Sequence, residues 1–145
     1  MYRHILLAVD GSEHSVRAAE EAIKIARLSP DSQVEVVYVA DFGKIKDDVL
    51  HTEGTAGLEV ARRKRLAPVE EKLEAADVSY YVTILRGEPG PTIVDHANQQ
   101  HVDLTIIGSR GLNGLQEMVL GSVSHKIAKI AKIAKRVKCP VLIVK

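Results

Sequence analysis

Five short apolar runs, rich in β-branched residues, recur along the chain, and a helical pattern fills each interval between them. Apolar runs without strict alternation are typical of strands that are covered on both faces. Strands and helices that alternate in this way indicate a parallel sheet, because right-handed crossovers place helices on both of its faces. We therefore predict an α/β fold that is doubly wound around five parallel strands. The runs are HILLAV (4–9), VEVVYVA (34–40), VSYYVTIL (78–85), VDLTIIG (102–108) and PVLIVK (140–145).

The intervals between the runs predict four helices. Pro68 lies inside the second helical pattern and is expected to kink it or to open a new turn. Residues 41–55 are longer than an ordinary strand-to-helix connection, so we expect a mobile lid or a solvated excursion there. The basic run RRKR (62–65) lies on a helical pattern and is expected to be a solvated face. The four helical patterns cover residues 13–28, 58–76, 91–100 and 122–137.

The composition is that of a small single domain. The 145 residues suit one core, and 20 Lys and Arg against 19 Asp and Glu give a net charge of +1. This balance indicates neither a nucleic-acid partner nor an anionic membrane. No run approaches the length of a membrane span, and the opening MYRHILLAVDG lacks a signal-peptide pattern, so we expect a cytoplasmic protein. Cys139 is the one cysteine, so an internal disulfide is excluded.

A glycine-rich stretch, GSRGLNGLQEMVLGS (108–122), joins the fourth predicted strand to the last predicted helix. Helix N-termini attract phosphate, because their N–H groups are unsatisfied and the helix dipole is positive there. Gly121 would let a phosphate approach the backbone closely, and the hydroxyls of Ser122 and Ser124 could donate hydrogen bonds to it. The alternative is a flexible surface loop with Ser122 as an ordinary N-cap, since no Walker lysine is present.

The spacing G-x2-G-x9-G-S, formed by Gly108, Gly111, Gly121 and Ser122, resembles the ATP-binding signature of the universal stress protein family. Further fragments agree with the family in order: ILLAVDGSEHS, VVYVAD, GEPGPTIVDHA, DLTIIGSRG, LGSVSHK and CPVLIVK. The resemblance implies a single domain over residues 1–145 with the Rossmann-like, adenine-nucleotide-α-hydrolase-like fold and the strand order 3-2-1-4-5. In that order the loops after the first and fourth strands face each other at the switch point, where ligands bind.

The same resemblance implies which residues contact the adenosine. Asp10, at the end of the first strand, would lie beside it, and the alternative for this residue is a turn or N-cap aspartate. Val39 would offer backbone hydrogen bonds to adenine, where the alternative is a plain core residue. Ile107 would flank the ribose as the fourth strand ends. Ala8 would line the pocket without specific chemistry.

For the phosphate end, the resemblance implies residues at both ends of the glycine-rich stretch. Gly108, Arg110 and Gly111 would wrap the ribose and the phosphates, and the Arg110 guanidinium could contact phosphate. We expect ATP with Mg²⁺ or Mn²⁺ on its phosphates, and we assign no protein ligand to the metal. The residues expected to hold the β- and γ-phosphates are Gly121, Ser122, Val123 and Ser124.

The segment KIAKIAKIAKRVKCP (126–140) repeats IAK three times and departs from the family pattern. It holds about six residues more than members of the family usually have, which in a helix would add about 9 Å. Either the last helix is longer and returns tightly, or part of the repeat is looped out. The lysines are expected to form a solvated face rather than a basic membrane or partner helix. Isoleucines and valine continue one apolar face through Ile127, Ile130, Ile133 and Val137.

The resemblance also implies an assembly and a function. In the family that the chain resembles, the final strand commonly pairs with its copy in a second subunit. Residues 140–145 are a short predicted strand of strong β propensity, so we expect a homodimer. We expect a nucleotide-dependent stress-response or signalling module rather than a dedicated enzyme. The principal alternative is a slow ATPase, which ranks lower because no general base or water-positioning residue is evident near the phosphates.

Two other folds of this class are disfavoured by their missing residues. A phosphorelay receiver domain needs an aspartate after the third strand, and LRGEPG (85–90) has none. A PP-loop ATP pyrophosphatase needs an SGGxDS-like loop after the first strand, which VDGSEHS (9–15) resembles only in part.

Overall fold

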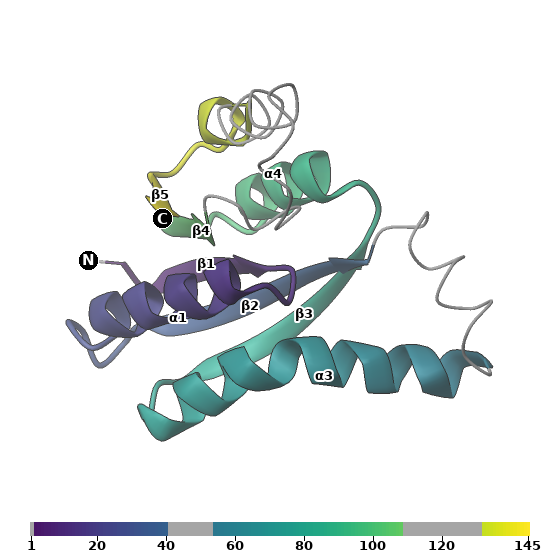
Figure 1. Ribbon diagram of the computed structural model, residues 1–145. Coiled ribbons are helices and arrows are strands. Elements are labelled where there is room, and N and C mark those ends of the chain that lie inside the picture. The colour runs from purple at the N-terminus through teal and green to yellow at the C-terminus, as the bar shows by residue number, and fades with distance from the viewer. Residues whose placement is uncertain (1, 41–53, 109–131) are drawn as a thin grey trace.

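The computed structural model describes residues 2–40, 54–108 and 132–145, in which five strands form one parallel sheet (Figure 1). The strand order is β3-β2-β1-β4-β5, which confirms the predicted fold and places β1 at the centre. All four neighbouring pairs run parallel. The strands are β1 (His4–Val9), β2 (Gln33–Ala40), β3 (Tyr80–Arg86), β4 (Leu104–Gly108) and β5 (Val141–Val144).

Helices cover both faces of the sheet, as predicted. The helices α1 (Glu13–Ala26) and α3 (Gly54–Ala75) pack on one face (Figure 1). On the other face lies α4 (Pro89–Gln99), together with a helical segment at residues 132–136. Pro68 lies inside α3, so the proline does not divide this pattern into two helices. The lid expected at residues 41–55 falls mostly outside the described residues, and its last two residues already belong to α3.

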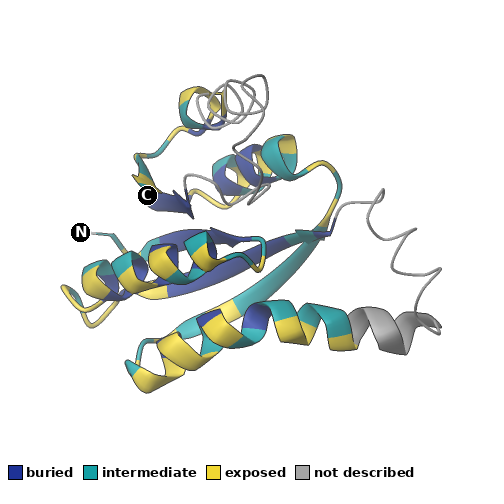
Figure 2. Ribbon diagram, viewed as in Figure 1, coloured by how far each residue is buried: buried dark blue, intermediate teal, exposed yellow. Residues whose placement is uncertain are grey.

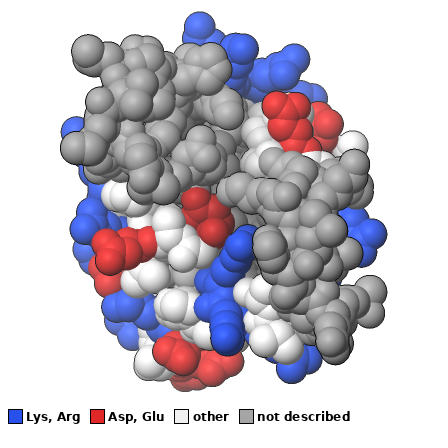
Figure 3. Space-filling model, turned by 45° about the vertical axis from the view of Figure 1, so that its right-hand side comes forward, with Lys and Arg blue, Asp and Glu red and all other residues white. Residues whose placement is uncertain are grey.

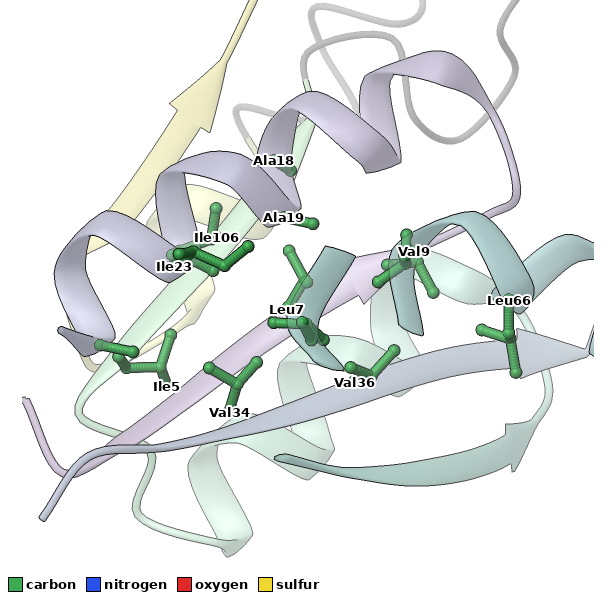
Figure 4. Packing of buried hydrophobic residues seen from close by; sticks show 14 of the residues in the cluster. Ile5, Leu7, Val9, Ala18, Ala19, Ile23, Val34, Val36, Leu66 and Ile106 are labelled. Carbon is green, nitrogen blue, oxygen red and sulfur yellow. The ribbon is translucent and has the colours of Figure 1, made fainter. Parts of the chain in front are cut away.

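Alternation along the central strands separates two apolar cores, because successive side chains of a strand point to opposite faces. Ile5 and Leu7 of β1 are fully buried beneath α1 and α3, where they meet Val34 and Val36 of β2 (Figure 4). Leu6 is fully buried on the opposite face, against α4. Figure 2 shows the result, with buried central strands and helices that are exposed on their outer sides. This rigid centre fixes the positions of the loops at both ends of the strands.

The carboxyl end of the chain is tied to α4. Asn98 donates from Nδ2 to the Arg136 carbonyl oxygen (3.1 Å), and its Oδ1 accepts the backbone N–H of Lys138 (2.9 Å). Ile133 and Val137 are buried in the core beneath α4. The end of the lysine-rich repeat is therefore helical and packed, and β5 returns directly into register with β4.

Of the geometries expected for the lysine-rich repeat, only its final part can be compared, since residues 126–131 lie outside the described residues. No helix in the described ranges is both long and apolar enough to span a membrane. On the face drawn in Figure 3, basic and acidic side chains are interspersed, in keeping with the small net charge of +1.

Candidate functional site

Five of the predicted adenosine-site residues lie at the carboxyl edge of three adjacent strands. Asp10 directly follows β1, Val39 lies near the end of β2, and Gly108 ends β4. Ala8 of β1 is in register with Ile107 of β4. From β1 the chain winds outward on one side through β2 to β3, and it then crosses to β4 and β5 on the other side of β1, so the switch point of the sheet lies between β1 and β4. Doubly wound folds bind their ligands at that point.

Asp10 holds the turn between β1 and α1. Its Oδ1 accepts hydrogen bonds from the Ser12 backbone N–H (2.9 Å) and from Ser15 Oγ (2.9 Å). Ser15 Oγ in turn accepts the Asp10 backbone N–H (2.9 Å), and Ser15 is 1% exposed. Among the described residues no group donates to Oδ2 of Asp10. The turn and a role beside a ligand are therefore compatible, because they use different oxygens.

The end of β2 projects past its neighbour at the centre of the sheet. The last pair between β1 and β2 joins Val9 to Tyr38, whereas β2 stays paired with β3 as far as Ala40. The backbone of Val39 therefore has a pairing partner in β3 and none in β1. A strand edge that is open on one side offers N–H and C=O groups to a planar ligand with donors and acceptors on its rim.

Gly108 lies against the first turn of α1. A Cβ at this position would lie 2.8 Å from His14 Cβ and 2.9 Å from the His14 carbonyl oxygen, so only glycine fits without a shift. Two polar atoms of the same turn, Ser12 Oγ and His14 Nδ1, are buried and have no hydrogen-bond partner among the described residues. Unpaired buried polar atoms are costly, and a site that binds a polar ligand is one place where they occur.

Arg65, at the border of this site, was not predicted from the sequence. Arg63 and Lys64 are exposed as expected for a solvated face, but Arg65 is half-buried and donates from Nη1 to Tyr38 Oη (2.6 Å). The sequence did carry a signal that Arg65 lies near the buried face of the helix, because the apolar Val69 follows it by one helical turn. The structure confirms that Val69 is fully buried. The prediction of a solvated face therefore holds for Arg63 and Lys64 and fails for Arg65, while Arg62 is partly exposed.

The predicted phosphate end of the site lies outside the described residues. It comprises Arg110, Gly111, Gly121, Ser122, Val123 and Ser124. Within the described ranges no group of three or more His, Cys, Asp or Glu side chains is arranged to hold a metal ion.

A second polar cluster, which the sequence analysis did not predict, lies within the sheet. Glu35 is 2% exposed and its carboxylate accepts three hydrogen bonds. Oε1 accepts from His4 Nε2 (2.7 Å), and Oε2 accepts from Thr83 Oγ1 (2.6 Å) and from His96 Nε2 (2.8 Å). The cluster joins three strands to α4. The signal in the sequence was a single glutamate inside the apolar run VEVVYVA (34–40).

The three hydrogen bonds to Glu35 favour the ionised form of its carboxyl group. Burial raises the pKa of the Glu35 carboxyl, but the hydrogen bonds from Thr83, His96 and His4 together outweigh burial, so the pKa lies below its ordinary value of 4.5. A carboxylate only accepts, so Nε2 of both histidines carries a hydrogen. Burial, and then the charge of Glu35, raise the pKa of the neighbouring Tyr81 hydroxyl. The cluster lies in the body of the sheet, so it serves the fold rather than the carboxyl-edge site.

Comparison with known proteins gives a match over the full length. The family model described as the universal stress protein family matches residues 1–145. Universal stress protein YxiE of Bacillus subtilis is 34% identical over 163 aligned residues, and the alignment covers 100% of both chains.

Solved structures share the fold. The hypothetical protein MJ0577 is 29% identical, with a TM-score of 0.75 over 100% of this chain and 96% of the other. A universal stress protein solved in complex with cAMP is 24% identical, with a TM-score of 0.65 over 99% of this chain and 97% of the other. The second likeness shows that the architecture is the same.

Proposed function

Because the chain belongs to the universal stress protein family, we propose that it binds an adenine nucleotide, namely ATP, at the carboxyl edge of the sheet. Binding would make it a nucleotide-dependent stress-response module of the cytoplasm. The single observation that carries the proposal is the meeting of Asp10, Val39 and Gly108 at the switch point. The cAMP complex of a protein with this fold supports an adenine nucleotide as the class of ligand.

The described residues fit the adenosine half of such a ligand. Oδ2 of Asp10 can accept hydrogen bonds from ribose hydroxyls while Oδ1 keeps the turn. The open backbone of Val39 matches the donor and acceptor edge of adenine. Ser12 Oγ and His14 Nδ1 are buried beside the same turn and would gain a polar partner when the site is filled.

For the triphosphate, the proposal rests on the glycine motif. Gly111, Gly121 and Ser122 would present backbone N–H groups and a hydroxyl to the phosphates at the start of the last predicted helix. Mg²⁺ or Mn²⁺ bound to the phosphates would neutralise part of their charge. Bound ATP would order a surface of this protein that a partner recognises. A binding module can signal in this way without hydrolysing the nucleotide.

A homodimer completes the proposal. In the sheet that residues 2–40, 54–108 and 132–145 form, β5 is the edge strand and pairs with β4, and its residue Ile143 is 41% exposed. An unpaired edge with an exposed apolar residue is suited to pairing with a second copy of itself.

The direct test is the identity of the bound small molecule. One sample of the purified protein is denatured, and the nucleotides that it releases are separated and identified by mass spectrometry. A second, folded sample is freed of bound nucleotide and titrated with ATP. Released or titrated ATP supports the proposal, whereas ADP that accumulates with time on the protein supports the slow ATPase. No binding of any adenine nucleotide would overturn both.

Asp10→Asn separates the ligand role of this residue from its turn role. Asparagine keeps an oxygen that can accept from Ser12 and Ser15, but it turns an NH₂ group toward the ribose hydroxyls. We expect an unchanged melting temperature and an affinity for adenosine that falls about tenfold. Glu13→Gln, which removes an exposed carboxylate three residues away, is the matched control and is expected to bind as the wild type. Equal affinity of the two variants would exclude Asp10 from the site.

A further inference from the structure

Arg65 of α3 contacts the neighbours of two residues that the proposed site uses. Along the chain, Gly11 follows Asp10 directly and Tyr38 precedes Val39 directly. Arg65 packs on the first of these neighbours and bonds to the second. Both contacts lie on the face of the sheet that carries α1 and α3.

The contact with Gly11 is made by the methylene groups of Arg65. A Cβ placed on Gly11 would lie 3.0 Å from Arg65 Cβ and 3.1 Å from its Cγ. Gly11 also has a φ of +89°, a conformation that other residues rarely adopt. The glycine therefore allows the arginine stem to lie directly against the backbone of the β1–α1 turn.

The contact with Tyr38 is made by the guanidinium group. Nη1 donates to Tyr38 Oη over 2.6 Å, and Tyr38 is 7% exposed. A short hydrogen bond from a charged donor to a buried hydroxyl is stronger than an average neutral one. Because Tyr38 makes the last pair between β1 and β2, the two strands have no ladder beyond it. Arg65 thus links the two strand ends where the sheet itself no longer does.

We propose that Arg65 is a positioning residue for the adenosine half of the site. It sets the separation between Asp10, which would hold the ribose, and Val39, which would bond adenine. This inference rests on the proposed nucleotide-binding function and goes beyond it, since Arg65 need not touch the ligand. A residue that sets the geometry of the adenosine contacts affects every ligand that contains adenosine by the same factor.

The experiment measures the affinities of the full-length protein for adenosine, AMP and ATP by titration calorimetry. Arg65→Met keeps most of the stem on Gly11 and removes the guanidinium. We expect it to weaken binding of each of the three ligands by about fivefold, since the hydrogen bond to Tyr38 is lost with the guanidinium. Arg63→Met removes an exposed charge from the same helix and is expected to bind all three as the wild type does.

A double-variant cycle tests the pathway through Tyr38. Tyr38→Phe is expected to weaken binding by a similar factor, and the double variant Tyr38→Phe with Arg65→Met is expected to bind no worse than Arg65→Met alone. Any other contact of Arg65 cancels in this comparison. In the ligand-free protein, the amide resonances of Asp10 and Val39 should shift in Arg65→Met and stay in place in Arg63→Met. If Arg65→Met does not fold, Arg65→Lys carries the same tests with a smaller expected loss.

Four outcomes would overturn the inference, and they are distinct. A loss that grows from adenosine to ATP would mean that Arg65 meets phosphate by its charge. If the affinity losses of Tyr38→Phe and Arg65→Met multiply in the double variant, the two residues do not act through their link. If Arg65→Met binds as tightly as Arg63→Met, the link to Tyr38 does not position the site. A wild-type protein that binds none of the three ligands would overturn the proposed function and this inference with it.

Discussion

Among single residues, Glu35 shows how a charge is accommodated inside a parallel sheet. Its carboxylate is almost fully buried, and three donors from β1, β3 and α4 replace the water that it loses. Burying a charge without such partners is costly. The hydrogen bonds from the two histidines and the threonine are therefore what allow an ionised Glu35 to be buried. The strand remains apolar on both sides of it, which is why the pattern still predicted a strand.

Glu35→Gln is expected to destabilise the fold. The amide keeps the size of the side chain but turns an NH₂ group toward at least one donor, so a hydrogen bond is lost and a buried donor is left unpaired. We expect the free energy of unfolding at pH 7 to fall by about 1–3 kcal/mol, measured by urea denaturation. Glu21→Gln, which removes a partly exposed carboxylate of α1 that pairs with Lys24, is the control and is expected to change it by less than about 0.5 kcal/mol.

The same variant gives the pH dependence of this cluster. The pKa of Glu35 is lowered in the folded state, so its contribution is fully present above the unfolded value of 4.5 and is lost as the pH falls through the folded pKa. The stability difference between wild type and Glu35→Gln should therefore shrink as the pH falls below 4.5. A difference that stays constant down to pH 3 would contradict this assignment.

Gly108 and Gly90 provide a matched pair of glycines. Alanine at Gly108 would place its Cβ 2.8 Å from His14 Cβ, beside backbone that cannot yield easily, and we expect a loss of about 1–3 kcal/mol. Alanine at Gly90 would meet Ile133 Cδ1 at 3.8 Å, an ordinary contact, and we expect no loss. Melting temperatures of the two variants make the comparison, and equal melting temperatures would mean that the β4 end can move away from α1.

At the residue scale the sequence predicted positions better than roles. The places of Asp10 and Gly108 at the switch point followed from strand ends and the glycine motif. The Asp10 turn was foreseen as an alternative, but the packing of Gly108 on His14 was not, because one sequence does not reveal which distant backbone approaches a glycine. Arg65 was missed for a related reason, since a basic run is solvated unless a partner such as the Tyr38 hydroxyl lies opposite.

At the scale of whole elements, the alternation of strands and helices predicted a parallel sheet with helices on both faces, whereas the strand order 3-2-1-4-5 came from the family resemblance. The start of α3 at Gly54 was not predicted, because Gly54 and Gly57 have low helix propensity and show no apolar period. Within residues 60–75 of α3, a narrow stripe is buried through Leu66, Val69 and Leu73, which is the spacing that packing on a sheet requires.

The link between α4 and the last helical segment predicts a local effect. Asn98→Ala removes both hydrogen bonds that hold residues 136–138, and we expect it to lower stability by about 1–2 kcal/mol. Hydrogen exchange should become faster in residues 132–145 than in β1 and β2, because the loss is confined to the end of the chain. Gln99→Ala, at the exposed neighbouring position, is the control, and uniform acceleration along the whole chain would contradict a local role.

At the scale of the whole molecule, the open edge at β5 predicts the state of assembly. Ile143→Glu places a charge on a strand edge that would otherwise pair with its copy. We expect light scattering to give about twice 15.8 kDa for the wild type at micromolar concentration and 15.8 kDa for the variant. Val60→Glu changes an exposed apolar residue on α3 and should leave the dimer intact. A wild-type mass near 15.8 kDa would contradict the homodimer.

The central place of β1 has a consequence for synthesis of the chain. As the protein leaves the ribosome, residues 2–86 supply β1, β2 and β3 together with α1 and α3, so one face of the sheet can close early. The other face, with Leu6 and Val37, stays bare until α4 and then residues 133–137 have emerged. The nascent chain therefore carries apolar sheet surface that is only partly covered until residues 133–137 are made, and exposed surface of this kind is what makes folding intermediates prone to aggregation.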